Sequence, residues 1–483
     1  MSIALHWFRR DLRLTDNTAL NAALATHTQV VPVYVASEWN GSHHWCGAAR
    51  QEFLCGSLQS LHRNLEMKGG RLIVRSGRAD LVLEMLARET GASAIYFNRD
   101  PDPFGREMER RIEAMAQKAG ISVHGFKDAA AHERDEVLTG ENRPFRVFTP
   151  YARAWSKLPE PAVGKTVVRI ALPDGVKGES LPTLDHWGIT GSAKIIEPGE
   201  AAARKRLAHF LDGPVFFYGQ RRDLPAEDGT SRLSQDFRHG LLSIREVLCE
   251  CRRASAEAKT TSDKQGVATF INELIWREFY FQVIWHSPDV LEHEFQEDTR
   301  RLPWRAHWRP EDENAWSRDA AARADFDAWR EGRTGFPIVD AGMRELAATG
   351  HMHNRLRMIT AMFLTKDLRI WWMHGESHFM RLLVDGEIAS NNGGWQWSAS
   401  TGTDAAPYFR IQNPWSQTKR FDPGGAYIKR WVPELRDVPA AKLCEPPPGI
   451  PIAKGYPLPI VDHGAARDAV LEMFRIGKPE RGR

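Results

Sequence analysis

Five short apolar runs, separated by segments with helical periodicity, fill the first 126 residues and constrain the fold of this chain most strongly. The runs are predicted strands at 3–8, 30–35, 71–75, 94–98 and 121–126. The segments between them, at 16–25, 51–68, 79–89 and 106–119, carry apolar residues at helical spacing. Strands that alternate with helices form parallel sheets covered on both faces. The alternation therefore predicts a doubly wound parallel α/β domain over residues 1–130.

Charged residues follow two of the predicted strands. Arg9, Arg10 and Asp11 come after the first strand, and Asp100 and Asp102 come after the fourth. Parallel sheets bind ligands at the carboxyl ends of their strands, so a ligand site at this edge is one interpretation. No GxGxxG follows the first strand, which argues against an ordinary dinucleotide site there. Loop charges and helix caps are the commoner role of such residues, and the pattern alone favours that role.

The residue composition changes twice after the α/β pattern ends. Residues from about 160 to 200 are rich in Pro, Gly and short polar segments such as LPDGVKGESLP, which is typical of a long connector. Helix formers dominate from residue 201 onward, and no repeat of fixed period is present. We therefore predict an α/β domain at 1–130, a connector at 131–200 and an all-helical domain at 201–483, a division that the chain length allows.

Composition restricts the partners and the compartment. The formal net charge is only +3, so any contact with nucleic acid must come from a local basic patch. The chain starts directly with a strand-like segment, and no apolar run reaches membrane-spanning length. We expect a cytoplasmic protein without membrane association, and we predict no metal site. The cysteines have no metal-ligand spacing and are expected to be reduced thiols: Cys46, Cys55, Cys249, Cys251 and Cys444.

The stretch 385–422 has a composition that neither an amphipathic helix nor a strand requires. Its first part carries two carboxylates and two amides, followed by paired glycines and a Trp-Gln-Trp. Glycines let the backbone approach a ligand closely, and the polar side chains offer donors and acceptors to a flat heterocycle. Core packing, a turn and helix caps would each explain single residues, but packing does not require so many amides and carboxylates beside aromatic residues. The stretch therefore predicts a ligand cradle.

Within this stretch, DGEIASNNGGWQWSASTGTDAAPYFRIQNP closely resembles the flavin-binding signature of the DNA photolyase and cryptochrome family. The resemblance is greatest to the class I cyclobutane pyrimidine dimer photolyases, and it extends from HWFRRDLRL at 6–14 to AYIKRWVPELRDVP at 426–439. It implies an antenna-binding α/β domain and a helical FAD-binding domain. The implied activity is that of a carbon–carbon lyase: light-dependent repair of pyrimidine dimers in DNA, by electron transfer from excited, fully reduced FAD to a flipped-out dimer.

Two other functions are compatible with the same motifs. A cryptochrome-type blue-light photoreceptor would share the fold and the flavin, but the retained Glu273, Trp276, Met358 and Trp397 and the short tail after Ile452 argue against it. A nucleic-acid-binding protein with a vestigial flavin pocket would have lost cofactor contacts, and nearly all of them are present. The implied partner is UV-damaged DNA, and we expect the protein to be a monomer.

The resemblance also implies which residues hold FAD. In GTSRLS, at 229–234, a hydroxyl-rich turn precedes a predicted helix, where it would cap the helix or hold a pyrophosphate. By resemblance, Asp385 pairs with Arg357, Asn391 lies near flavin N5, and Glu387 stands where class I members usually have Asp. The implied FAD contacts are Tyr218, Thr230, Ser231, Leu233, Ser234, Arg277, Asn354, Arg357, Asp385, Glu387 and Asn391.

The motif NELIWREFY carries the implied substrate contacts. Glu273 would hydrogen-bond the dimer and Trp276 would stack on it, with Trp397 as a second aromatic wall. Glu273 and Arg277 are four residues apart, so a surface ion pair on a helix is the alternative. Lys419 and Arg420 would add charge at the mouth of the site. The implied DNA-binding set is Arg222, Glu273, Trp276, Arg355, Met358, Trp397 and Arg410.

Electron supply and light harvesting complete the implied machinery. The family reduces its flavin along three tryptophans, which correspond here to Trp395, Trp372 and, as the outer member, Trp316. Trp304 and Trp308 are alternatives, because the segment between Trp316 and Trp329 is longer than the usual spacing. With Glu273 and Asn391, the three tryptophans form the predicted catalytic set.

An antenna chromophore of the deazaflavin type is favoured over methenyltetrahydrofolate or FMN by the segments RRDLRL, AARQEFL and NRDPDPFGRE. The residues that these segments nominate are Asp11, Arg50, Asp100 and Asp102. An empty antenna pocket is the alternative.

Overall fold

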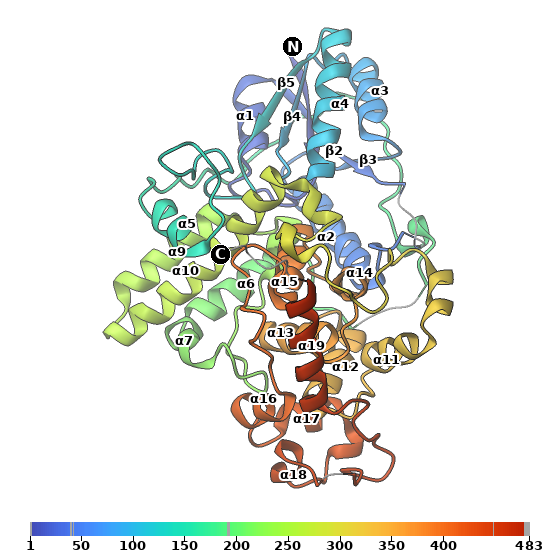
Figure 1. Cartoon of the computed structure of the whole chain (residues 1–483). Helices are drawn as coiled ribbons and strands as arrows, with labels where there is room; N and C mark the ends of the chain where they lie inside the picture. Colours follow the sequence, from blue (N-terminus) through green and yellow to red (C-terminus); the bar gives the residue numbers. More distant parts are fainter. Residues whose placement is uncertain (1, 39–40, 42, 191–193, 448, 478–483) are drawn as a thin grey trace. The chain divides into compact units, whose positions relative to one another are not determined.

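The computed structural model describes residues 2–38, 41, 43–190, 194–447 and 449–477 (Figure 1). The chain divides into two compact units. The first contains Met1–Gly219 and Ser231–Pro288, and the second contains Gln220–Thr230 and Asp289–Arg483. Each unit is described by itself below.

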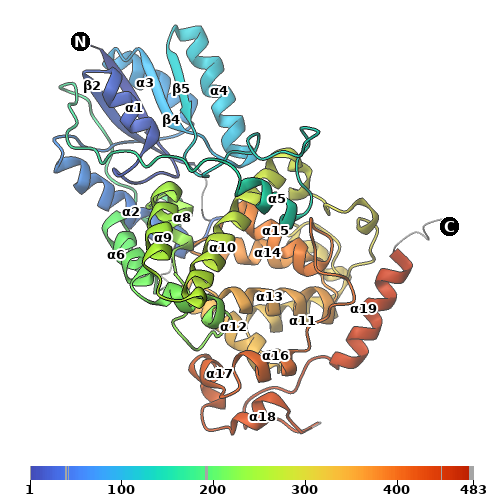
Figure 2. The ribbon, with the colours of Figure 1, turned by 90° about the vertical axis from the view of Figure 1, so that its left-hand side faces the viewer.

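A five-stranded parallel sheet forms the amino-terminal part of the first unit, with strand order β3-β2-β1-β4-β5 (Figures 1 and 2). The strands are β1 Ile3–Phe8, β2 Gln29–Ala36, β3 Ile73–Ser76, β4 Ala94–Asn98 and β5 Ser122–Phe126. The order reverses on the two sides of β1, so the carboxyl ends of β1 and β4 form the switch point where such sheets bind ligands. The predicted α/β sheet is confirmed.

Helices α1 Thr18–Thr26, α2 Ala48–Glu66, α3 Ala79–Thr90 and α4 Pro103–Ala119 alternate with the strands. Two of them start at side-chain caps. Asn17 accepts a hydrogen bond from the backbone N–H of Leu20 at 3.1 Å, and Asp102 accepts one from Gly105 at 2.8 Å with Pro103 in the first turn. Both capping residues follow the carboxyl end of a strand, which is why polar residues concentrate there.

The rest of the first unit is helical. It contains α5 Phe148–Trp155, α6 Glu200–Leu211, α8 Ser234–His239, α9 Ile244–Glu257 and α10 Thr261–His286, and the short helix α7 Tyr218–Arg221 spans the boundary between the units. The 26-residue helix α10 starts at a capping box, in which Thr260 and Asp263 each accept a hydrogen bond from the other's backbone N–H. This helix carries the NELIWREFY motif.

The second unit is built from helices around one apolar core. They are α11 Ala320–Arg330, α12 Pro337–Thr349, α13 Asn354–Met362, α14 Trp372–Leu382, α15 Ile388–Ala399, α16 Pro414–Phe421, α17 Ala426–Trp431, α18 Ala440–Cys444 and α19 His463–Gly477. Trp329, Trp372 and Trp395 are buried in the core of this unit. The predicted helical carboxyl-terminal half is confirmed. Among the described residues, no helix has both the length and the apolar character that crossing a membrane requires.

Candidate functional site

One face of α10 carries the residues implied to contact the substrate. Leu274, Ile275 and Phe279 are buried, whereas Glu273 and Trp276 remain partly accessible. Residues three apart lie on the same side of a helix, so Glu273 and Trp276 present a carboxylate and an indole together. The helix thus offers an acid and an aromatic surface side by side within the first unit.

Arg277 lies next to this pair and contacts the protein's own backbone. Its Nη1 donates to the carbonyl oxygen of Ala129 at 2.7 Å, and its Nη2 donates to that of Phe237 at 3.4 Å. The guanidinium also lies 4.4 Å from the ring centroid of Phe281. These contacts hold the guanidinium in place beside α8.

The hydroxyl-rich turn before α8 leaves the first turn of that helix without a side-chain cap. Leu233 occupies the N-cap position, and no side-chain hydrogen bond caps the helix there. The Leu233 side chain is buried, so a contact from this residue to a cofactor has to come from its backbone. Ser234 is exposed and Ser231 is partly exposed. The hydroxyl groups of this turn therefore do not cap α8 in the described structure.

Arg357 and Asp385 form an ion pair in the second unit. Arg357 Nη2 lies 2.8 Å from Asp385 Oδ2, and Arg357 Nε donates to the Met352 carbonyl oxygen at 2.8 Å. The Asp385 side chain is 2% exposed and that of Arg357 is 27% exposed, so the guanidinium is the accessible member. The pair joins α13 to the turn before α15.

The two adjacent amides on α15 have different surroundings. Asn391 is partly exposed and donates from Nδ2 to the carbonyl and to the carboxylate of Glu376, at 3.0 and 3.1 Å. Asn392 is buried and donates to the carbonyl of Val290 at 3.0 Å. Asn391 is thus fixed in orientation near the surface of the helix, whereas Asn392 serves the packing of the second unit.

Helix α13 presents three further residues of the predicted sets. Asn354 is exposed, and Met358 and Arg355 are partly exposed. Arg355 forms a 2.8 Å ion pair with Asp223, and its guanidinium lies 4.6 Å from the ring centroid of Phe421. A phosphate that binds Arg355 therefore competes with a carboxylate.

The N-terminus of α13 depends on a neutral histidine. His353 Nδ1 accepts a hydrogen bond from the backbone N–H of Arg355 at 3.2 Å, which requires that this nitrogen carry no proton. Burial, together with the charge of His351, lowers the pKa of His353 to about 4. The sequence did not single out this residue, although it directly precedes Asn354.

The three predicted tryptophans each have a different set of contacts. The Trp395 ring lies edge-on to Phe379, with centroids 4.9 Å apart, and to Trp329, with centroids 6.0 Å apart. Trp372 instead donates from Nε1 to the carboxylate of Glu294 at 3.1 Å and packs on Trp371.

Trp316 belongs to a third set of rings that connects back to Trp329. It packs on Trp308 at 5.4 Å and stacks on Phe326 at 5.1 Å, and Phe326 stacks on Trp329 at 5.7 Å. Trp304 packs on Phe474. Trp329 and Phe326 are three residues apart on α11, a spacing by which the sequence could have flagged them.

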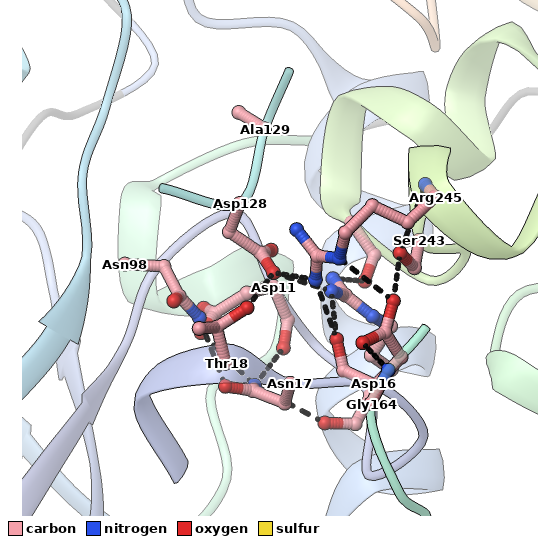
Figure 3. A network of polar contacts seen from close by, with 12 residues as sticks. Asp11, Asp16, Asn17, Thr18, Asn98, Asp128, Ala129, Gly164, Ser243 and Arg245 are labelled. Carbon is pink, nitrogen blue, oxygen red and sulfur yellow. Dashed lines mark hydrogen bonds and ion pairs between the residues drawn. The ribbon is translucent and has the colours of Figure 1, made fainter. Parts of the chain in front are cut away.

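Three of the residues nominated for the antenna, Asp11, Asp100 and Asp102, follow the carboxyl ends of β1 and β4, whereas Arg50 lies on α2. Asp11 is buried and accepts hydrogen bonds from the Arg9 backbone N–H and from the side-chain amides of Asn17 and Asn98, at 2.7, 3.1 and 2.7 Å. Figure 3 shows Asp11 within a larger buried polar network. In that network Arg245 of α9 contacts Asp16 and Asp128 at 3.0 and 2.7 Å.

Asp100 and Asp102 also have partners. Arg10 lies 3.1 Å from Asp100, and Arg9 lies 3.6 Å from it. Burial alone would raise the pKa of Asp100, but Arg10, Arg9 and Arg238 lower it to about 2, whereas burial and the charge of Asp100 raise the pKa of Asp102 to about 7. Arg50 donates to the carbonyl of Trp45. Asp102 thus caps α4, Asp11 belongs to the buried polar network, and Asp100 pairs with Arg10.

The basic residues predicted to contact DNA are accessible. In the second unit Arg410, Lys419 and Arg420 are exposed and Arg222 is partly exposed. Trp397, also in this unit, is partly exposed, unlike the buried Trp395. Trp397 thus has accessible aromatic surface, whereas Trp395 belongs to the core.

Comparisons with known proteins show which family the chain belongs to. Residues 4–166 match the DNA photolyase family, and residues 270–476 match the FAD binding domain of DNA photolyase. A deoxyribodipyrimidine photo-lyase from Synechococcus sp. is 37% identical, with 99% of this chain and 98% of that protein covered. The deoxyribodipyrimidine photo-lyase from Escherichia coli (strain K12) is also 37% identical, with 99% of both chains covered.

Solved structures show the same similarity. A bacterial class III photolyase from Agrobacterium tumefaciens has a TM-score of 0.89 at 35% identity, covering 99% of this chain and 98% of that one. An archaeal photolyase from Sulfolobus tokodaii with two FAD molecules has a TM-score of 0.82 at 31% identity, covering 98% and 100%. A Synechocystis cryptochrome has a TM-score of 0.87 at 26% identity, covering 98% and 99%. The chain therefore belongs to the DNA photolyase family.

Proposed function

We propose that this enzyme repairs cyclobutane pyrimidine dimers in DNA, in a reaction driven by light and supplied with an electron by fully reduced FAD. The observation that carries the proposal is the accessible face of α10, where Glu273 and Trp276 lie together, in a chain that is 37% identical over its whole length to deoxyribodipyrimidine photo-lyases. Membership of the family makes DNA repair the coarse function. The dimer as substrate is the finer step proposed here.

The family resemblance nominates the residues that would hold FAD. Hydroxyl and backbone groups of the turn before α8 suit the pyrophosphate, since the first turn of α8 has no side-chain cap. Arg357, held by Asp385, and Asn391, held by Glu376, offer oriented donors to a flat ring system. The proposed set is Tyr218, Thr230, Ser231, Leu233, Ser234, Arg277, Asn354, Arg357, Asp385, Glu387 and Asn391.

FAD, when bound in its fully reduced form, would supply the light-driven electron chemistry that breaks the two carbon–carbon bonds of the dimer, with no net redox change. The residues of the chain bind and orient the substrate. Glu273, in its protonated form, would donate a hydrogen bond to a thymine carbonyl oxygen and stabilise the negative charge that develops there. Trp276 and Trp397 would supply aromatic walls for the extruded bases. Cationic side chains, Arg222, Arg355, Arg410, Lys419 and Arg420, would contact phosphates.

Initial reduction of the flavin would draw on Trp395, Trp372 and Trp316. An antenna chromophore would bind in the α/β domain, with the deazaflavin type favoured by resemblance and with FMN and methenyltetrahydrofolate as alternatives. Absorption and mass spectrometry of the chromophores extracted from the purified protein would distinguish these three antenna types. We further propose an α/β domain at 1–130, a connector at 131–200 and a helical FAD-binding domain at 201–483, in a monomeric, cytoplasmic protein.

A blue-light photoreceptor is the second candidate function, since the Synechocystis cryptochrome shares the fold. The two candidates are separated by illuminating the reduced, purified protein with dimer-containing oligothymidylate and following the recovery of thymine absorbance. A dark sample and Glu273→Ala are the test arms, and Glu257→Ala, an exposed carboxylate at the end of α9, is the matched control. Light-dependent recovery that only Glu273→Ala weakens supports repair. No recovery with bound, fully reduced FAD contradicts repair and favours the photoreceptor.

A further inference from the structure

Trp276 is stacked on an aromatic ring from another part of the first unit. The rings of Trp276 and Phe148 have centroids 3.7 Å apart and planes that differ by only 7°. Phe148 is the first residue of α5 and is 7% exposed, whereas Trp276 is partly exposed. The phenyl ring therefore covers one face of the indole and leaves accessible surface on the indole itself.

A third ring fixes the pair from the side. Phe279, one helical turn beyond Trp276 on α10, lies edge-on to Phe148 at 5.8 Å and edge-on to Trp276 at 5.6 Å. Edge-on and parallel contacts are both favourable arrangements of aromatic rings. The three rings thus restrict rotation of the indole about its side-chain torsions.

Polar anchors hold the segment that carries Phe148 on α10. Gln282 donates from Nε2 to the carbonyl of Phe145 at 2.7 Å, and the indole N–H of Trp155 donates to the Glu278 carboxylate at 2.6 Å. Glu278 also accepts from the backbone N–H of His132 at 3.2 Å. These anchors lie at both ends of residues 145–155, so Phe148 cannot move away from Trp276 without breaking them.

We propose that Phe148 is a positioning residue for lesion recognition, which backs the Trp276 indole so that its opposite face receives a flipped-out pyrimidine pair. The inference rests on the proposed function, in which Trp276 stacks on the dimer. A side chain that is already fixed in its bound orientation loses little conformational freedom on binding, so the affinity is higher. An undamaged duplex keeps its bases stacked and is held by phosphate contacts, so it does not use this wall.

The test compares binding of the FAD-loaded protein, in the dark, to one oligonucleotide with and without a single thymine dimer. Phe148→Ala is expected to weaken binding of the dimer oligonucleotide about tenfold and to change binding of the undamaged one less than about twofold. Phe148→Tyr, which keeps the flat ring, is expected to restore wild-type binding. Phe148→Leu keeps an apolar side chain of similar volume without the flat ring. It is expected to weaken binding of the dimer oligonucleotide about as much as Phe148→Ala does, and it provides the test if the alanine variant folds poorly.

Phe145→Ala is the matched control. Phe145 is a partly buried phenylalanine of the same segment whose ring packs edge-on to Tyr151. The control is expected to keep the preference for the dimer oligonucleotide, and FAD content and the unfolding temperature of every variant are measured alongside. An equal loss of dimer affinity in Phe145→Ala would overturn the proposal, because loosening the segment would then explain the effect.

A double-mutant cycle with Trp276→Ala tests whether Phe148 acts through the indole. In the Trp276→Ala background, Phe148→Ala is expected to cause no further loss of dimer affinity. An undiminished loss in that background, or an equal loss for undamaged DNA, overturns the positioning role. The wild-type protein separates this failure from failure of the proposed function, because a wild type without any preference for the dimer contradicts both.

Discussion

At the scale of single residues, the Arg357–Asp385 pair shows how the candidate site combines an accessible cation with a buried counter-ion. The carboxylate is almost fully buried, and the guanidinium is anchored a second time by the Met352 carbonyl. Losing one partner of a buried charge pair costs far more than losing a surface pair, because the remaining charge keeps its desolvation penalty.

Asp385→Asn is therefore expected to lower both the stability and the FAD occupancy of the purified protein. The expected loss is about 1–3 kcal/mol of unfolding free energy, the cost of weakening a hydrogen bond to a charged group. Denaturant unfolding and the ratio of flavin to protein absorbance measure the two effects. Asp468→Asn, which removes an exposed carboxylate 3.9 Å from Arg467, is the control and should change neither.

At the scale of elements, α13 carries Asn354, Arg355, Arg357 and Met358 and begins at the neutral cap His353. The pKa of His353 is lowered to about 4, from an ordinary value of 6.5. Between these values the unfolded chain binds a proton that the folded protein does not bind. The contribution of His353 to stability is thus fully present above pH 6.5 and is lost as the pH falls towards 4.

His353→Asn is expected to reduce the loss of stability on acidification. Asparagine is a good N-cap and accepts the same kind of hydrogen bond, but it does not titrate. The wild type should lose on the order of 3 kcal/mol more than the variant across this pH range. Denaturant unfolding at several pH values from 7 to 4 gives the unfolding free energy of each protein, and the two pH profiles are compared. Identical pH profiles of the two proteins would contradict a neutral His353 cap.

Helix α11 connects Trp395 with Trp316 through rings that bypass Trp372. Trp329 contacts Trp395, and Phe326 stacks between Trp329 and Trp316. Electron transfer between aromatic side chains is faster the closer they lie. In the proposed reduction of the flavin, an electron hole on Trp395 would therefore have a route to Trp316 along Trp329 and Phe326, in addition to the route through Trp372 that the family resemblance implies.

Trp372→Phe is accordingly expected to retain part of the photoreduction of oxidised FAD, measured as bleaching of flavin absorbance in the presence of an external thiol. Adding Trp329→Phe should remove most of the remainder, and Trp395→Phe alone should abolish it. The control is Trp187→Phe, a fully buried tryptophan of the first unit. If Trp372→Phe is as inactive as Trp395→Phe, the route through α11 does not operate.

At the scale of the whole molecule, a net charge of +3 means that affinity for DNA has to come from a few placed cations. Arg410, Lys419 and Arg420 are exposed residues of the second unit. Each cation that contacts a phosphate releases condensed counter-ions from the DNA, which makes the affinity depend on salt concentration.

Arg410→Ala and Lys419→Ala are each expected to reduce the slope of log affinity against log salt concentration by about one, with little effect on the preference for a dimer. Binding isotherms at several salt concentrations give the slope. Lys118→Ala, an exposed lysine on α4, is the control and should leave the slope unchanged. An unchanged slope in both test variants would remove these residues from the proposed DNA contacts.

Much of the fold was readable from the sequence. The five strands were predicted to within two residues at each end, because apolar runs and their spacing are local properties. The helical second half followed from composition, and the motifs at 270–280 and 385–414 implied the family. The deazaflavin antenna stays a prediction, and Asp11, Asp100 and Asp102 each have a partner within the protein.

What the sequence by itself determined is the family and the types of element that carry its motifs, since periodicity and motif spacing depend only on residues close together in the chain. Only the tertiary structure decided that Phe148 backs Trp276, that Asp223 pairs with Arg355 and that Trp329 joins Trp395 to Phe326. Such contacts join residues far apart in the chain, or on different elements. They depend on how helices pack, and no local pattern in the sequence specifies that packing.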